Sequence, residues 1–180
     1  MEPDLKTLGL KLKDVLHWSA PSIPPWILKR PTIDLSLQGF CKEDTSPEIY
    51  RSKFYELCNK YKGFSQLYTD GSKVGDRVAS AVVFRNITNT CRLPDKAGIS
   101  RAELYAIKLA MTLIRRTKES NLLILSHSLS SLQALRETKF ECDLVYKIIK
   151  DYSNITGTSM DWHGFHAIYP VIGNIAHSKR

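Results

Sequence analysis

From Gly63 onward, short apolar runs are followed by apolar repeats at helical spacing. This pattern restricts the fold more than any other feature of the sequence. Runs rich in apolar and β-branched residues predict strands. They lie at residues 64–70, 78–84, 88–93 and 122–125, with a possible last strand at 159–162. Turn residues at 70–72 and 74–76 are expected to join the first two strands, and the third would complete an antiparallel meander. Strands mixed with helical segments predict an α/β domain rather than a helix bundle or a sandwich.

The helix expected at residues 100–116 has the clearest periodicity of the chain. Its apolar residues recur at one-turn and two-turn spacing, as on one face of a helix: Ala102, Tyr105, Ala106, Leu109, Ala110 and Leu113. Ser126 or Ser128 can cap a following helix, in which Leu129, Leu132 and Leu135 share a face. Another helix is indicated by Leu144, Val145, Ile148, Ile149 and Tyr152.

The first 62 residues differ in composition from the rest of the chain. Pro21, Pro24, Pro25 and Pro31 disfavour helices and central strands, so we expect an extended connector here. A short helix is predicted at residues 46–61, because Ser-Pro-Glu offers a cap, proline at the first helical position and an early acid. The predicted organisation is a Pro-rich connector over residues 1–62 and an α/β domain over 63–180.

Composition limits the classes of partner. The 26 basic side chains exceed the 18 acidic ones, for a net charge of +8 across 180 residues, which favours polyanionic partners. No apolar run approaches the roughly 20 residues that span a membrane, and the N-terminus does not resemble a signal peptide. We therefore expect an intracellular protein without a membrane partner. The four cysteines have no spacing typical of a zinc site or a disulfide framework.

Two acidic residues are candidates for a functional site. Asp70 is expected at a strand end before Gly-Ser, where a carboxylate projects from a rigid element and the backbone can approach a ligand. The simpler alternative is a turn-forming aspartate. Glu103 flanks the apolar face of its helix; the alternative there is an early helical glutamate favoured by the helix dipole.

Three blocks in this order resemble a known family: Tyr68-Thr69-Asp70-Gly71-Ser72-Lys73, the segment 101–107 (RAELYAI) and the segment 125–135 (LSHSLSSLQAL). They resemble the ribonuclease H type 1 domain of non-LTR (LINE-type) retrotransposon polyproteins. The resemblance runs from about Gly63 to the last residue, and the Pro-Pro-Trp segment with the helix after it is similar to the connector that precedes this domain. The reverse transcriptase of such polyproteins is absent from this chain.

The resemblance implies a ribonuclease H-like fold, with a central mixed five-stranded sheet flanked by helices. It also implies four carboxylates that hold two Mg²⁺ or Mn²⁺ ions and hydrolyse the RNA strand of an RNA–DNA hybrid. Asp70 matches the first acid and Glu103 the second, as catalytic residues and metal ligands. Gly71, Ser72 and Lys73 are expected to contact nucleic acid, as is His166, which matches a loop histidine of the family.

Two of the four acids are missing. His127 stands at the third position, within Ser126-His127-Ser128, and is retained as a candidate catalytic residue. Ile175 replaces the acid of Gly-Asn-Glu, the last acid falls on His177 or Ser178, and no acidic residue follows Asp161. The chain also ends early for the closing helix of the family, so a C-terminally truncated domain is expected.

These substitutions leave three interpretations open. The domain is a nuclease with reduced activity, because halving the ligand charge weakens the binding of two dications. Alternatively, it is a noncatalytic module, in effect a pseudoenzyme, that binds hybrid or duplex nucleic acid through backbone and shape. The third interpretation is a retrotransposon remnant without a selected function.

Overall fold

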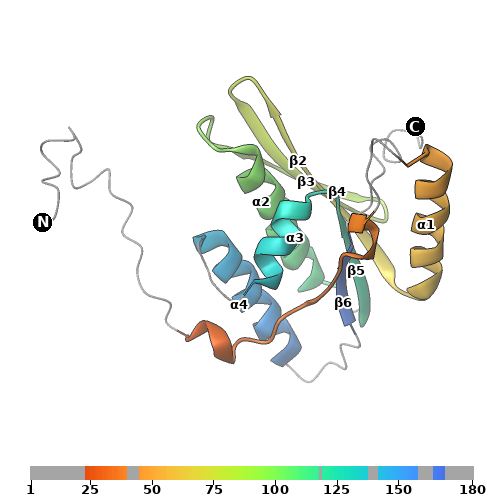
Figure 1. Ribbon diagram of the computed structural model, residues 1–180. Helices are drawn as coiled ribbons and strands as arrows, with labels where there is room; N and C mark the ends of the chain where they lie inside the picture. The colour runs from red at the N-terminus through yellow and green to blue at the C-terminus, as the bar shows by residue number, and fades with distance from the viewer. Residues whose placement is uncertain (1–22, 40–44, 118, 138–141, 158–163, 169–180) are drawn as a thin grey trace, which may run out of the picture.

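The computed structural model describes residues 23–39, 45–117, 119–137, 142–157 and 164–168 (Figure 1). For 156–157 and 164–168 it describes the backbone alone. The predicted strand at 159–162 and the two C-terminal positions where acids are missing, Ile175 and His177 or Ser178, lie outside these residues.

A six-stranded mixed sheet forms the centre of the described chain, in the order β1-β6-β5-β2-β3-β4. The strands are β1 (Thr32–Asp34), β2 (Ser65–Val74), β3 (Arg77–Phe84), β4 (Ile87–Leu93), β5 (Asn121–Ser126) and β6 (Gly164–Ile168). Strands β1, β6, β5 and β2 are parallel, whereas β2, β3 and β4 form the expected antiparallel meander.

This arrangement confirms the α/β class with a mixed sheet flanked by helices, and it is consistent with a ribonuclease H-like fold. The count of five strands is wrong by one. Residues after Gly63 contribute five strands, and β1 adds a sixth because residues 32–34, within the predicted connector, pair with β6. A Pro-rich segment can form such a short strand at the edge of a sheet, because a missing backbone donor that faces solvent costs no hydrogen bond between strands.

The β2–β3 hairpin differs from its prediction. Strand β2 continues through residues 70–72, so the predicted turn there is wrong, and only Gly75 and Asp76 form the connection. Asp-Gly is an ordinary turn dipeptide, but here β3 pairs with both residues, Asp70 with Ala81 and Gly71 with Ser80. Gly75 adopts a φ of +57°, the left-handed conformation that a tight hairpin turn requires.

Helices cover both faces of the sheet (Figure 1). The predicted helices are confirmed as α1 (Pro47–Lys60), α2 (Ile99–Ile114), α3 (Leu129–Arg136) and α4 (Asp143–Gly157). The last three pack on one face with the main apolar core, whose strand residues include Leu67, Val82, Leu122 and Ile124. Alternate residues of β5, Leu123 and Leu125, point to the other face and contact α1. Strand β5 is therefore buried on both sides, as its continuous apolar run requires.

Ser128 caps α3, which decides between the two predicted caps. Its hydroxyl accepts a hydrogen bond from the backbone N–H of Ser131 at 3.4 Å. Leu132 and Leu135 are buried against the main core. The cap fixes where β5 ends and α3 begins, and therefore the position of His127 between them.

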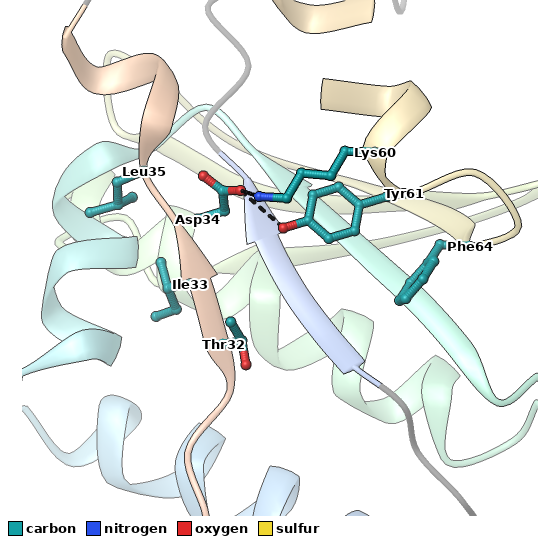
Figure 2. Close-up of a pocket in the computed structure, with 7 residues that line it drawn as sticks. All are labelled: Thr32, Ile33, Asp34, Leu35, Lys60, Tyr61 and Phe64. Carbon is teal, nitrogen blue, oxygen red and sulfur yellow. Dashed lines mark hydrogen bonds and ion pairs between the residues drawn. The ribbon is translucent and has the colours of Figure 1, made fainter. Parts of the chain in front are cut away.

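Asp34 ties β1 to the end of α1 (Figure 2). One oxygen of its carboxylate accepts hydrogen bonds from Lys60 Nζ and the Tyr61 hydroxyl, both at 2.9 Å, and the other accepts from the Ser36 backbone N–H at 2.9 Å. Asp34, Lys60 and Tyr61 line a pocket of about 540 Å³ together with Thr32, Ile33, Leu35 and Phe64. Partial burial acts to raise the pKa of Asp34, but the hydrogen bonds from Ser36, Lys60 and Tyr61 outweigh it and hold the pKa well below its ordinary value of 3.8.

None of the helices in the described part of the chain is long and apolar enough to cross a membrane. Its three cysteines, Cys58, Cys91 and Cys142, are free thiols.

Replacing Asp34 with alanine is expected to lower the free energy of unfolding by about 2 kcal/mol, since a mostly buried carboxylate loses three hydrogen bonds. Because its pKa is depressed in the folded state, the stabilisation is present above about pH 4 and is lost as the pH falls further. Urea titrations at neutral pH and at about pH 3 would show a smaller acid-induced loss in Asp34→Ala than in the parent. Asp95→Ala, which removes an exposed ion pair with Arg92, serves as the control and should change stability by less than about 0.5 kcal/mol. Equal effects of the two variants would contradict the role given to Asp34.

Candidate functional site

Asp70 and His127 meet where the parallel pairing of β2 and β5 ends. The register runs from Ser65 opposite Leu122 to Thr69 opposite Ser126. Asp70 is the next residue of β2, and His127 follows the last residue of β5. Parallel strands bring residues at their carboxyl ends to one edge of the sheet, where sites of α/β proteins commonly lie. Two positions 57 residues apart in sequence thus become neighbours.

Glu103 reaches the same place from α2, whose first turns lie directly against β2 and β3. A Cβ atom on Gly71 would stand 2.5 Å from the backbone nitrogen of Glu103, so only glycine fits between strand and helix. The buried Ser80 hydroxyl on β3 donates a hydrogen bond to the Ala102 carbonyl at 2.6 Å. These two contacts set the distance between helix and sheet, and therefore the position of the Glu103 carboxylate.

The three side chains form one compact group. His127 Nε2 lies 3.1 Å from Glu103 Oε1 and 3.4 Å from Asp70 Oδ1. One donor atom from each residue lies within 4.8 Å of the others, which is compatible with a shared metal ion. The side chain of Glu103 is only 7% exposed, whereas those of His127 and Asp70 are 48% and 64% exposed. A buried carboxylate therefore forms the base of the group, and the two other side chains open toward solvent.

The three donors can hold a metal ion, but they do not suit the two divalent ions that the resemblance implies. Glu103 Oε2 is buried and has no hydrogen-bond partner among the described residues, which is costly for a carboxylate oxygen unless a cation neutralises it. The group can therefore hold a metal ion. Two carboxylates and one imidazole do not fit a pair of Mg²⁺ ions, since these need more oxygen ligands and more negative charge. The site accordingly matches one ion better than two.

The other predicted contact residues have different surroundings. Gly71 faces the backbone of α2, so its missing side chain serves the packing of the helix rather than the approach of a ligand. Ser72 and Lys73 are exposed on β2 beyond Asp70, and Lys73 Nζ donates a hydrogen bond to the Ala97 carbonyl at 3.3 Å. Both remain accessible to a ligand.

His166 lies in β6 and not in a loop, which corrects the loop placement that the resemblance implies. Its backbone pairs with Thr32 of β1 and Leu123 of β5. Leu123 is three residues before the end of β5, whereas His127 follows that end. The buried strand β5 pairs with a neighbouring strand on each edge: β2 on one edge and β6 on the other.

Ser80 was missed by the sequence reasoning, although it positions Glu103. The available signal was a single hydroxyl within the otherwise apolar run Val78-Ala79-Ser80-Ala81-Val82-Val83. A polar side chain on the buried face of a strand needs a hydrogen-bond partner, but the strand pattern does not identify that partner.

No known protein-family model matches this chain, and no curated protein matches it.

Gly71→Ala is expected to destabilise the protein by about 2 kcal/mol or more, because the added methyl group would overlap the backbone of α2 rather than a flexible side chain. The helix would have to move and carry Glu103 away from His127. Thermal or urea unfolding measures the loss. Gly39→Ala is the matched control, since a Cβ there meets no atom within 4 Å. A Gly71→Ala variant as stable as the control would contradict the close contact.

Proposed function

We propose that this chain is a ribonuclease H type 1-like domain that binds RNA–DNA hybrid or related duplex nucleic acid, with metal-dependent hydrolysis of the RNA strand weakened or lost. The observation that carries the proposal is the convergence of Asp70, Glu103 and His127 at one edge of the sheet. Under this proposal the ancestral ions are Mg²⁺ or Mn²⁺, and the chain derives from a retrotransposon polyprotein.

The convergence supports the proposal because the three resembling blocks are far apart in sequence. The first lies in β2, the second in α2, and the third spans the end of β5 and the start of α3. The residues of these blocks that match the acidic positions of the family are the ones whose side chains lie within 4.8 Å of one another. A chance similarity of three short segments would not require their key side chains to meet.

The charge of the group favours binding over cleavage. In the two-ion mechanism, four carboxylates neutralise the metals that activate water and stabilise the leaving oxygen. Here two carboxylates remain, and His127 lies within 3.4 Å of both. Fewer carboxylates repel a phosphate backbone less, while two fully occupied Mg²⁺ sites become harder to form.

The cleavage of a labelled RNA–DNA hybrid tests the catalytic part of the proposal. We expect at most slow cleavage in Mg²⁺, because two ions are poorly neutralised, and any residual cleavage should disappear in Asp70→Asn. The double variant His127→Asp with Ile175→Asp restores carboxylates at two positions and is expected to raise the rate at least tenfold. Cleavage by the parent at the same rate as by the double variant would contradict a weakened centre.

Binding of the same hybrid, measured by fluorescence anisotropy in EDTA, tests the nucleic-acid-binding part of the proposal. The affinity should fall steeply with salt, because phosphate contacts release counterions. Lys73→Ala is expected to weaken binding a few-fold and to lower the salt slope by about one, as for the loss of a single phosphate contact.

The control for Lys73 is Lys53→Ala, which removes an exposed lysine on α1 that pairs with Glu56. Its affinity for the hybrid should equal that of the parent. Binding without any dependence on salt, or the same loss in both lysine variants, would count against the proposed surface.

A further inference from the structure

We propose that Asp70, Glu103 and His127 form a site for a single transition-metal ion such as Zn²⁺, in preference to Mg²⁺. The inference builds on the proposed function, since it names the ion of the same site, but it can be tested without nucleic acid. It departs from the pair of Mg²⁺ ions that the resemblance implies.

The distances from the His127 imidazole to the two carboxylates match those between donors on one ion. Two donor atoms bound about 2.1 Å from a metal, at angles of about 90° to 110°, lie about 3.0 to 3.4 Å apart. His127 Nε2 lies 3.1 Å from Glu103 Oε1 and 3.4 Å from Asp70 Oδ1. The imidazole nitrogen thus stands at ligand spacing from both carboxylates.

The buried oxygen of Glu103 that lacks a hydrogen-bond partner is a second indication of a cation site. The side chain is 7% exposed, and Oε2 has no hydrogen-bond partner among the described residues, although Oε1 contacts His127. A hydrogen bond from one imidazole satisfies one carboxylate oxygen and leaves the second without compensation. A metal ion bound to this carboxylate would supply the missing positive charge.

The chemistry of the donors selects the metal. Imidazole nitrogen binds Zn²⁺ more readily than Mg²⁺, which prefers oxygen ligands in octahedral geometry. Two carboxylates balance the charge of one dication but not of two. Three protein ligands with a position open to solvent are typical of zinc sites that bind water. Asp70 and His127 provide this opening, because both side chains are about half exposed or more (64% and 48%).

Metal titrations of the complete chain test the inference, with Zn²⁺, Mn²⁺ and Mg²⁺ followed by calorimetry and by thermal unfolding. Co²⁺ serves as a spectroscopic probe of nitrogen coordination. We expect Zn²⁺ to bind at least tenfold more tightly than Mg²⁺ and to raise the midpoint of thermal unfolding. His127→Ala should lose at least tenfold in Zn²⁺ affinity and the visible absorption of Co²⁺. His127→Asp should shift the preference toward Mg²⁺.

Two variants separate a ligand role from a general effect. Glu103→Gln keeps the shape of the side chain but removes its charge, and it should lose Zn²⁺ binding while its circular dichroism stays that of the parent. Asp76→Asn, an exposed acid six residues beyond Asp70, should bind Zn²⁺ as the parent does. Equal affinities for Zn²⁺ and Mg²⁺, or unchanged Zn²⁺ binding in His127→Ala, would overturn the inference.

The two proposals can fail separately. Hybrid binding in EDTA without selective Zn²⁺ binding would remove the metal inference and leave the proposed nucleic-acid function in place. Selective Zn²⁺ binding by a chain that does not bind the hybrid would support the metal site and overturn the proposed function.

Discussion

The contact between Gly71 and the first turns of α2 is the constraint on which the rest of the site depends. A Cβ atom on Gly71 would stand 2.5 Å from the backbone of Glu103, so helix and strand pack too closely for any side chain there. The Ser80 hydroxyl bonds the Ala102 carbonyl one residue earlier in the helix. Packing against β2 and a hydrogen bond from β3 thus fix the backbone of α2 at Glu103 relative to the sheet.

Because the Glu103 carboxylate is buried, the charges of the residues around it matter for its stability. Glu103 is nearly inaccessible to water, and one of its oxygens lacks a partner among the described residues. His127 contacts the other oxygen and also Asp70. Under the proposed function, His127 stands where the family has a carboxylate, and an imidazole there changes both the charge and the donor type. The three side chains then offer a mixed nitrogen and oxygen site in place of an all-carboxylate one.

The described residues before 63 are part of the folded structure. Strand β1 extends the sheet beside β6, and α1 covers Leu123 and Leu125 on the face that the other helices leave open. Asp34 joins the two elements through Lys60 and Tyr61. An ion pair and two neutral donors satisfy this carboxylate, unlike that of Glu103, which explains why one acid stabilises the fold and the other is suited to a ligand.

The sequence by itself determined the α/β class, the four helices, most strands and the identity of the candidate residues. Helical periodicity placed Glu103 beside a buried face, and apolar runs placed β3, β4 and β5, because these patterns depend on local geometry. The tertiary structure decided what depends on partners distant in sequence. Asp70 and Gly71, predicted in a turn, lie in strand β2 because β3 pairs with both residues. Only glycine fits at position 71, because the backbone of α2 packs against it. The tertiary structure also added β1 to the sheet, placed His166 in a strand and brought Asp70, Glu103 and His127 together, since strand register and helix packing are set by contacts across the chain.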